Sequence, residues 1–142
     1  MGNCIYKHQL NKCTPENTPK YEFKNVTKLC RVLSVYDGDT ITIAIRLEKT
    51  IYQAKVRMFG YDSPEMKPLK KIENRLDIIK DAKIAQRALA DKILGKIVSA
   101  ELLGFDKYGR LLANIHYANE NLNKYMVDNE YGYPYFGGTK RP

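Results

Sequence analysis

The sequence predicts an α+β, mainly β protein: a five-stranded barrel with one main helix and a short C-terminal helix packed against it. Three observations predict this class. Stretches of alternating apolar and polar residues recur along the chain, an amphipathic helical pattern separates the first three from the last two, and turns rich in Asp and Gly join neighbouring stretches. With 142 residues, the chain is long enough to bury one core.

The N-terminal segment differs from the rest. Residues 1–24 are polar, contain prolines and show neither helical nor strand periodicity, so we expect a flexible arm before one folded domain at 25–142. The arm begins with Gly2 and Cys4, the residue types that carry myristoyl and palmitoyl chains in doubly acylated proteins. Because Tyr6 stands where the myristoylation motif has Ser or Thr, an unmodified tail is the alternative.

The cysteines and the N-terminus also bear on location. The three cysteines cannot all pair within the chain, which favours a reducing compartment. No apolar signal segment follows Met1, and no apolar run is long enough to cross a bilayer. We therefore expect an intracellular, cytoplasmic protein that is membrane-associated only if Gly2 and Cys4 are acylated.

Three strands are predicted at the start of the folded domain. Residues 28–36 form a strand-like run that ends at Asp37-Gly38, a dipeptide typical of tight hairpin turns with a positive φ at Gly. Residues 40–47 alternate as in a strand with one buried face. A third alternating stretch ends at Met58, and its polar face is formed by Gln53, Lys55 and Arg57.

The second half of the chain supplies the remaining elements. A helix is predicted at 77–94, because apolar residues recur three or four positions apart and Gly95 follows as a stop signal. Residues 96–105 and 110–117 form two further predicted strands, joined by a tight turn. A short helix around 122–130 precedes an aromatic, glycine-rich tail. This order of elements is that of a five-stranded antiparallel OB-fold barrel.

The net charge of the chain is strongly positive. Twenty-four Lys and Arg residues against sixteen Asp and Glu give a formal charge of +8 and a pI near 9.3. This balance is expected of a protein that binds a polyanion, and equally of a well-solvated basic surface. The charge therefore favours nucleic acid as a partner only in combination with more specific features.

Acids and arginines occur at the predicted strand ends. Asp39 and Asp62 follow strands that a barrel brings together, and Glu65 comes three positions after Asp62. Their oxygens suit a hard cation such as Ca²⁺ or Mg²⁺, whereas an Asp beside Gly is commonly only a turn residue. Arg57 and Arg110 stand at comparable strand ends. A guanidinium binds two phosphate oxygens at once, although a surface strand arginine is the simpler alternative for each.

Three motifs together resemble those of a known family. They are VYDGDT at 35–40, RMFGYDSPE at 57–65 and DKYGR at 106–110. In order and internal spacing they resemble the staphylococcal nuclease, or thermonuclease, family over about Leu29 to Gly138, which implies an SNase-like OB-fold. The resemblance also implies a calcium-dependent endonuclease that hydrolyses phosphodiester bonds of DNA and RNA and leaves 3′-phosphate ends.

The resemblance implies a role for each matching residue. The ligands of the catalytic Ca²⁺ would be Asp39, Asp62 and the backbone carbonyl of Ser63. The catalytic residues would be Glu65, which orients or deprotonates the attacking water, and Arg57 and Arg110, which bind the scissile phosphate. Charge on the phosphorane-like transition state would then be neutralised by one cation and two guanidiniums.

Further residues are candidates for binding substrate. Tyr108 lies beside Arg110 in the sequence and resembles a family tyrosine near the nucleotide, with a core-covering role as its alternative. Lys70 and Lys71 follow Glu65, where they would steer substrate or form a solvated charge run. We expect single-stranded or locally melted DNA and RNA as partners, a monomeric state, and a membrane tether only through an acylated N-terminus.

A second function class is a non-catalytic OB-fold module that binds nucleic acid or protein. Such a module is expected to have lost acids or arginines. All five charged candidates are present here, which favours catalysis.

Overall fold

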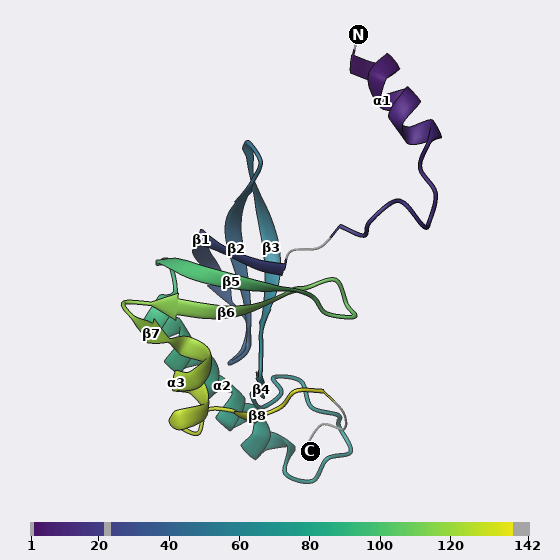
Figure 1. The fold of residues 1–142 in the computed structure, drawn as a ribbon. Coiled ribbons are helices and arrows are strands. Elements are labelled where there is room, and N and C mark those ends of the chain that lie inside the picture. The colour runs from purple at the N-terminus through teal and green to yellow at the C-terminus, as the bar shows by residue number, and fades with distance from the viewer. Residues whose placement is uncertain (1, 22–23, 138–142) are drawn as a thin grey trace.

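The computed structural model describes residues 2–21 and 24–137 of the chain. Its barrel strands are β1 (Lys24–Val35), β2 (Thr40–Leu47), β3 (Thr50–Met58), β5 (Ile97–Phe105) and β6 (Leu111–Tyr117). Neighbours pair antiparallel in the order β3-β2-β1-β5-β6, and a β3–β6 pair closes the barrel (Figure 1). This confirms the predicted mainly β, OB-type barrel.

The pair that closes the barrel adds a detail that the sequence pattern does not give. All sequential neighbours are antiparallel, but the closing pair of β3 and β6 is parallel. The cause is geometric: when five strands alternate in direction, the first and the last run the same way. Closing this barrel therefore joins Val56, Arg57 and Met58 to Leu111, Leu112 and Ala113 in parallel register, which brings the end of β3 beside the start of β6.

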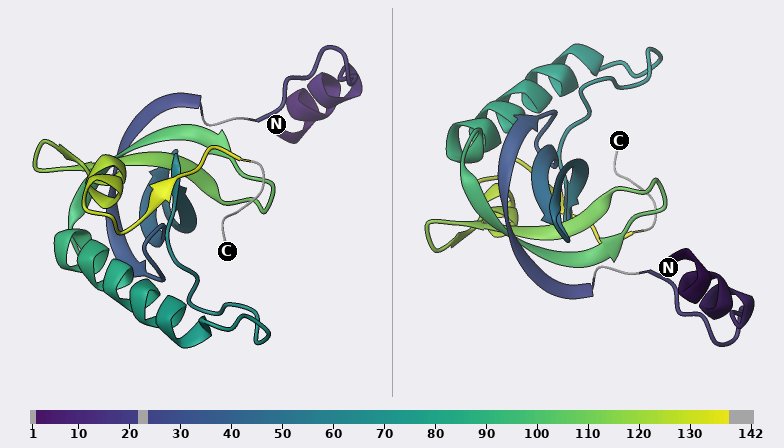
Figure 2. Two further views of the ribbon diagram at one scale, coloured as in Figure 1. Left: turned by 90° about the horizontal axis from the view of Figure 1, so that it is seen from below. Right: turned by 90° about the horizontal axis from the view of Figure 1, so that it is seen from above.

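Two helices pack at one end of the barrel (Figures 1 and 2). The main helix, α2 (Arg75–Ile93), buries Ala82, Ala85, Leu89 and Ile93, which is the apolar stripe that the sequence predicts. The short helix α3 (Leu122–Asp128) buries Leu122 and Met126. Both predicted helices are thus confirmed, with α2 starting two residues earlier than expected.

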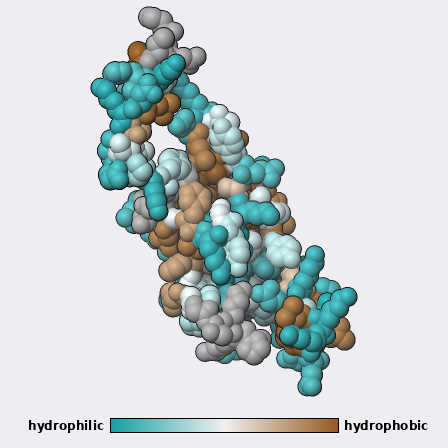
Figure 3. Space-filling view, turned by 90° about the vertical axis from the view of Figure 1, so that its right-hand side faces the viewer, coloured by the Kyte–Doolittle hydropathy of each residue, from teal (hydrophilic) through white to brown (hydrophobic). Residues whose placement is uncertain are grey.

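A third helix, α1 (Gly2–Asn11), lies in the N-terminal arm and was not predicted. It stands apart from the barrel (Figures 1 and 2). Its apolar side chains Ile5 and Leu10 are exposed, and hydrophobic atoms lie among hydrophilic ones at the top of Figure 3. A helix without a buried face needs no apolar stripe, so the pattern gave no signal for it. The flexibility of the arm stays a prediction.

The acylation hypothesis for Gly2 and Cys4 stays untested, because their side chains lie outside the described part of the chain. No helix within the described ranges has the length and apolar character needed to cross a membrane.

Short strands complete the fold. The tail forms β8 (Tyr133–Pro134), which pairs with β4 (Tyr61–Asp62), and β7 (Glu120–Asn121) pairs with the end of β6. The tail passes so close to β4 that a Cβ added at Gly132 would lie 2.6 Å from Cδ2 of Tyr61. The C-terminal segment therefore covers the strand that carries Asp62.

A buried amide connects α3 to the barrel near the end of β3. The side chain of Asn123 accepts a hydrogen bond from the backbone of Ile115 (2.9 Å) and donates to the carbonyls of Phe59 (2.8 Å) and Ala113 (3.1 Å). The buried N–H of Ile115 would otherwise need another partner away from water, whereas the Ala113 carbonyl also accepts a hydrogen bond from the Phe59 backbone (3.0 Å). Asn123 thereby fixes the chain just after β3, between Arg57 and Asp62.

Candidate active site

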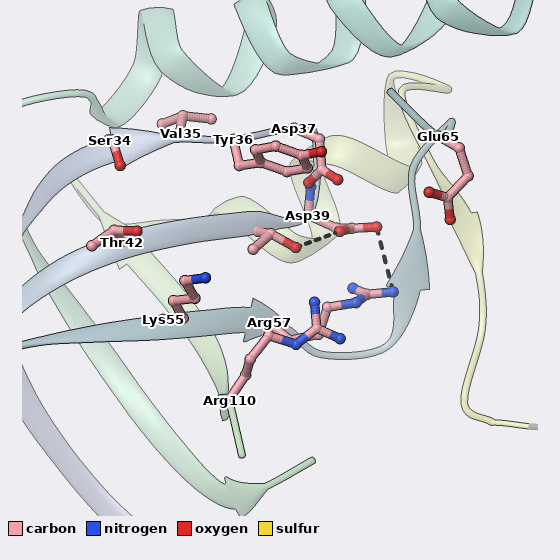
Figure 4. A pocket seen from close by; sticks show the side chains of 11 residues that line it. Ser34, Val35, Tyr36, Asp37, Asp39, Thr42, Lys55, Arg57, Glu65 and Arg110 are labelled. Atoms are coloured by element: carbon pink, nitrogen blue, oxygen red, sulfur yellow. Dashed lines mark hydrogen bonds and ion pairs between the residues drawn. The ribbon is translucent and has the colours of Figure 1, made fainter. Parts of the chain in front are cut away.

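A pocket of about 680 Å³ lies where the β1–β2 turn, the end of β3 and the segment after β4 meet (Figure 4). Asp39 reaches it from the turn, Arg57 from β3, and Arg110 from the residue before β6. Glu65 enters from the opposite side, on the segment after β4. The structure thus brings four of the predicted residues to one pocket.

The turn that carries Asp39 is held by local and long-range contacts. Asp37 Oδ1 accepts a hydrogen bond from the Asp39 backbone (3.0 Å), and the Tyr61 hydroxyl donates to the Gly38 carbonyl (2.6 Å). The positive φ predicted for Gly38 was wrong. Glycine is needed there for space, because an added Cβ would lie 2.6 Å from the Cβ of Ser63.

Arg57 lies between two buried carboxylates. Its Nη2 donates to Oδ1 of Asp62 and stands 3.4 Å from Oδ2 of Asp39. The same Asp39 oxygen accepts a hydrogen bond from the Ser63 backbone (2.8 Å). Asp62 is only 1% exposed and Asp39 6%, so Asp62 lies against Arg57 rather than at the pocket surface. Two carboxylates therefore converge on one positive group.

This arrangement suits a cation bound by oxygen atoms. In the described part of the chain, no three Asp, Glu, His or Cys side chains are close enough together to hold a metal by themselves. Asp39 and Asp62 would therefore need help from neutral oxygens, such as the Ser63 carbonyl. Asp39 and Asp62 are both buried beside the guanidinium of Arg57, and two buried negative charges beside one positive group favour a further positive ion. The donor set fits Ca²⁺ or Mg²⁺.

The ionisation of Asp37 yields a prediction about stability. Burial and the neighbouring Asp39 carboxylate raise the pKa of Asp37 to about 7. In the unfolded chain Asp37 has its ordinary pKa of 3.8, so between about pH 4 and pH 7 only the folded state keeps the proton. The stability that this proton contributes is therefore full at low pH and is lost as the pH rises from about 4 to about 7. In chelator, the free energy of unfolding should fall by on the order of 2–4 kcal/mol across this range.

Urea denaturation at pH 5 and pH 8 measures this effect. Asp37→Asn should remove most of the pH dependence, while Asp81→Asn, an exposed acid on α2, should leave it as in the wild type. Equal pH dependence in the wild type and Asp37→Asn would contradict the assignment.

The second arginine is oriented by its own hairpin turn. Asp106 accepts hydrogen bonds from Nε of Arg110 (2.6 Å), from the Arg110 backbone (2.8 Å) and from the Tyr108 backbone (2.9 Å). Burial alone would raise the pKa of Asp106, but these bonds together lower it below its usual value. Asp106 therefore stays ionised and holds the Arg110 guanidinium at the pocket.

Both arginines also line a second pocket, of about 420 Å³, on their other side. Its walls include Tyr108, Tyr135 and Phe136. The Tyr108 ring is 72% exposed and its centroid lies 5.5 Å from Cζ of Arg110. The two guanidiniums thus stand between a polar, acidic pocket and an aromatic one.

Two predicted substrate-binding residues lie elsewhere. Lys70 and Lys71 are exposed in the loop between β4 and α2, and neither lines the pockets that contain Arg57 and Arg110. Their steering role stays a prediction.

Sequence reasoning missed other residues of the site. Asp37 was taken only as a turn residue, and its proximity to a second acid two positions later was the available signal. The sequence pattern places Lys55 on the same polar face of the strand as Arg57 but gives it no role. In the structure, Lys55 lines the polar pocket with Ser34 and Thr42.

Two comparisons with known proteins found similar sequences. Residues 55–138 match the family described as "Staphylococcal nuclease homologue". A protein of Haemophilus influenzae, described as an uncharacterized endonuclease, is 32% identical over 98 residues, which are 69% of this chain and 47% of that protein. The chain thus spans about half the length of this relative. The matched family range includes Arg57, Glu65 and Arg110, while Asp39 lies before it.

Proposed function

Because the chain belongs to the staphylococcal nuclease homologue family, we propose that it is a calcium-dependent endonuclease that hydrolyses phosphodiester bonds of DNA and RNA. The observation that carries this proposal is the pocket in which Arg57, Arg110 and Glu65 face the same space as Asp39. The endonuclease description of the Haemophilus influenzae relative supports the same activity.

The two arginines would bind the scissile phosphate. A guanidinium is permanently charged and presents its N–H groups in a plane that matches phosphate oxygens. Arg57 is held by Asp62, and Arg110 by Asp106, so both charges are positioned before substrate arrives. Charges fixed in advance stabilise the negative charge that develops on phosphorus-bound oxygens, with little reorganisation.

Glu65 would take the proton of the attacking water. Its carboxylate lines the pocket across from β1, β2 and β3, within the space that the arginines also face. A base in this place can accept a proton as water attacks a phosphate held by the guanidiniums.

The cation site would consist of Asp39, Asp62 and the Ser63 carbonyl. Bound there, Ca²⁺ would supply a positive charge that polarises a phosphate oxygen and makes water a stronger nucleophile. The hydrogen bond from Ser63 N to Asp39, and that from the Tyr61 hydroxyl to Gly38, hold the two ligand-bearing segments together without a metal.

The aromatic pocket favours unpaired substrate. A base that has left its stack could enter the space of about 420 Å³ and stack on Tyr108, whereas a base inside a duplex is already stacked and paired. Single-stranded or locally melted DNA and RNA are therefore the proposed substrates.

Replacement of Glu65 tests the proposed chemistry. Glu65→Gln removes the proton acceptor and keeps the shape, so we expect kcat to fall by about 10²–10⁴ with little change in KM. The measurement is cleavage of fluorescent single-stranded DNA and RNA in Ca²⁺. Glu73→Gln, in the exposed loop before α2, is the matched control and should keep wild-type rates. Equal rates in the two variants would exclude Glu65 from the reaction.

The alternative of a non-catalytic binding module gives a different result. It predicts that the wild type binds oligonucleotides and leaves them intact under every metal condition. A monomeric state, a cytoplasmic location and an unmodified or acylated N-terminus remain predictions. Light scattering tests the first, and mass spectrometry of the native protein tests the last.

A further inference from the structure

The polar pocket extends beyond the groups that the proposed chemistry uses. Besides the acids and arginines, its walls include Ser34, Thr42 and Lys55, which lie farther along β1, β2 and β3 (Figure 4). Hydroxyl and ammonium groups together are donors suited to a phosphate. None of these three residues lines the second pocket, which contains Tyr108, Tyr135 and Phe136.

Strand register places these groups in a row beside the active site. Arg57 pairs with Thr40, and Lys55 pairs with Thr42, which in turn pairs with Ser34 on β1. Lys55 and Arg57 are two residues apart on β3, so they share a face and stand roughly 7 Å apart along the strand. An extended single strand can place neighbouring phosphates at such a spacing.

The charged side chains of these strands are all positive. The sequences of β1, β2 and β3 contain no Asp or Glu. Lys55 is exposed and forms no ion pair with any residue that the structure describes, and Arg31 and Arg46 are also exposed on the same three strands. The acids of the pocket come from the β1–β2 turn and the segment after β4, so the ammonium group of Lys55 is available to a phosphate.

On the basis of the proposed function, we propose that Lys55, Thr42 and Ser34 form a second phosphate-binding subsite. It takes the phosphodiester group next to the scissile one, on the side away from the aromatic pocket. The scissile phosphate then lies at Arg57 and Arg110, with one neighbouring base in the aromatic pocket and the neighbouring phosphate on the β1–β2–β3 face. The subsite makes affinity depend on strand length.

Binding measured in chelator tests the subsite without any cleavage. The probes are fluorescent single-stranded DNA of eight nucleotides and thymidine monophosphate, whose single phosphate cannot occupy both sites. Lys55→Gln should bind the long probe about 5–10-fold more weakly than the wild type at low salt. Because each phosphate contact on a single strand contributes about 0.7 to the slope of log K against log salt, that slope should fall by about 0.7. The short probe should bind unchanged.

A lysine elsewhere on the surface is the control. Lys83 is exposed on α2 and lines neither the polar nor the aromatic pocket, so Lys83→Gln should match the wild type with both probes. Thr42→Val should also weaken binding of the long probe, as Lys55→Gln does.

Three outcomes would overturn the subsite. Lys55→Gln could bind the long probe as tightly as the wild type does, or it could lose affinity equally for both probes. The third outcome is that the wild type binds the two probes with the same affinity. Cleavage by the wild type is assayed separately in Ca²⁺. If Lys55→Gln loses affinity only for the long probe but the wild type does not cleave, the nuclease proposal is wrong and the subsite stands. If the wild type cleaves but Lys55→Gln keeps its affinity for the long probe, the subsite is wrong and the nuclease proposal stands.

Discussion

Replacing Arg57 with alanine is expected to reduce cleavage by about 10³–10⁵-fold, the range observed when an arginine that stabilises phosphoryl transfer is removed. Arg57 lies between the polar and aromatic pockets and contacts both Asp39 and Asp62. Its loss removes a phosphate ligand and leaves two buried carboxylates without their cation. In chelator, the free energy of unfolding should therefore also fall, by about 3–5 kcal/mol.

Single-turnover cleavage and urea denaturation measure these two effects. Arg57→Lys keeps the charge and loses the planar fork, so it should recover stability more than activity. Arg87→Ala is the control, because its ion pair with Asp91 is exposed and should contribute less than about 1 kcal/mol. If Arg57→Ala cleaves and unfolds as Arg87→Ala does, the assignment of Arg57 is wrong.

Replacing Asp39 with asparagine is expected to lower cleavage by roughly 10²–10⁴-fold in Ca²⁺. The reason is that a metal ion at a phosphate contributes several kcal/mol to the transition state, and each factor of ten is about 1.4 kcal/mol. Asparagine keeps an acceptor for the Ser63 backbone, so the turn should stay in place. Cleavage measured against Ca²⁺ concentration should show a higher half-saturating concentration.

Asp62→Asn should act in the same direction as Asp39→Asn, since both carboxylates face Arg57. Asp81→Asn on α2 serves as the control and should keep the wild-type response. An unchanged Ca²⁺ response in both Asp39→Asn and Asp62→Asn would show that these acids do not hold the metal.

The strands were predictable because each has one buried face. Alternation in β2 and the end of β3 follows directly from Ile41, Ile43 and Val56 pointing into the core. The partner of each strand is a different question. Periodicity carries no information about pairing, so the parallel closure of β3 against β6 and the pairing of β4 with the tail appeared only in the structure.

The candidate site shows the same division. Asp39, Arg57, Glu65 and Arg110 came from motifs, and the pocket brings them together. The roles of Asp37 and Asp106 depend on contacts with Asp39 and Arg110, which a turn signal does not reveal. The Asp-Gly turn signal also gave the wrong reason for glycine at position 38. Glycine is required there because the Ser63 side chain, more than twenty residues away in the sequence, leaves no room for a Cβ.

We propose that the pocket around Arg57 hydrolyses phosphodiesters with the help of Ca²⁺. This is tested by the rate at which purified protein shortens an end-labelled single-stranded DNA in excess Ca²⁺ and in chelator. We expect internal cleavage with Ca²⁺, an intact strand in chelator, and recovery when Ca²⁺ is restored. An intact strand under all three conditions, with the strand still bound, would contradict this proposal.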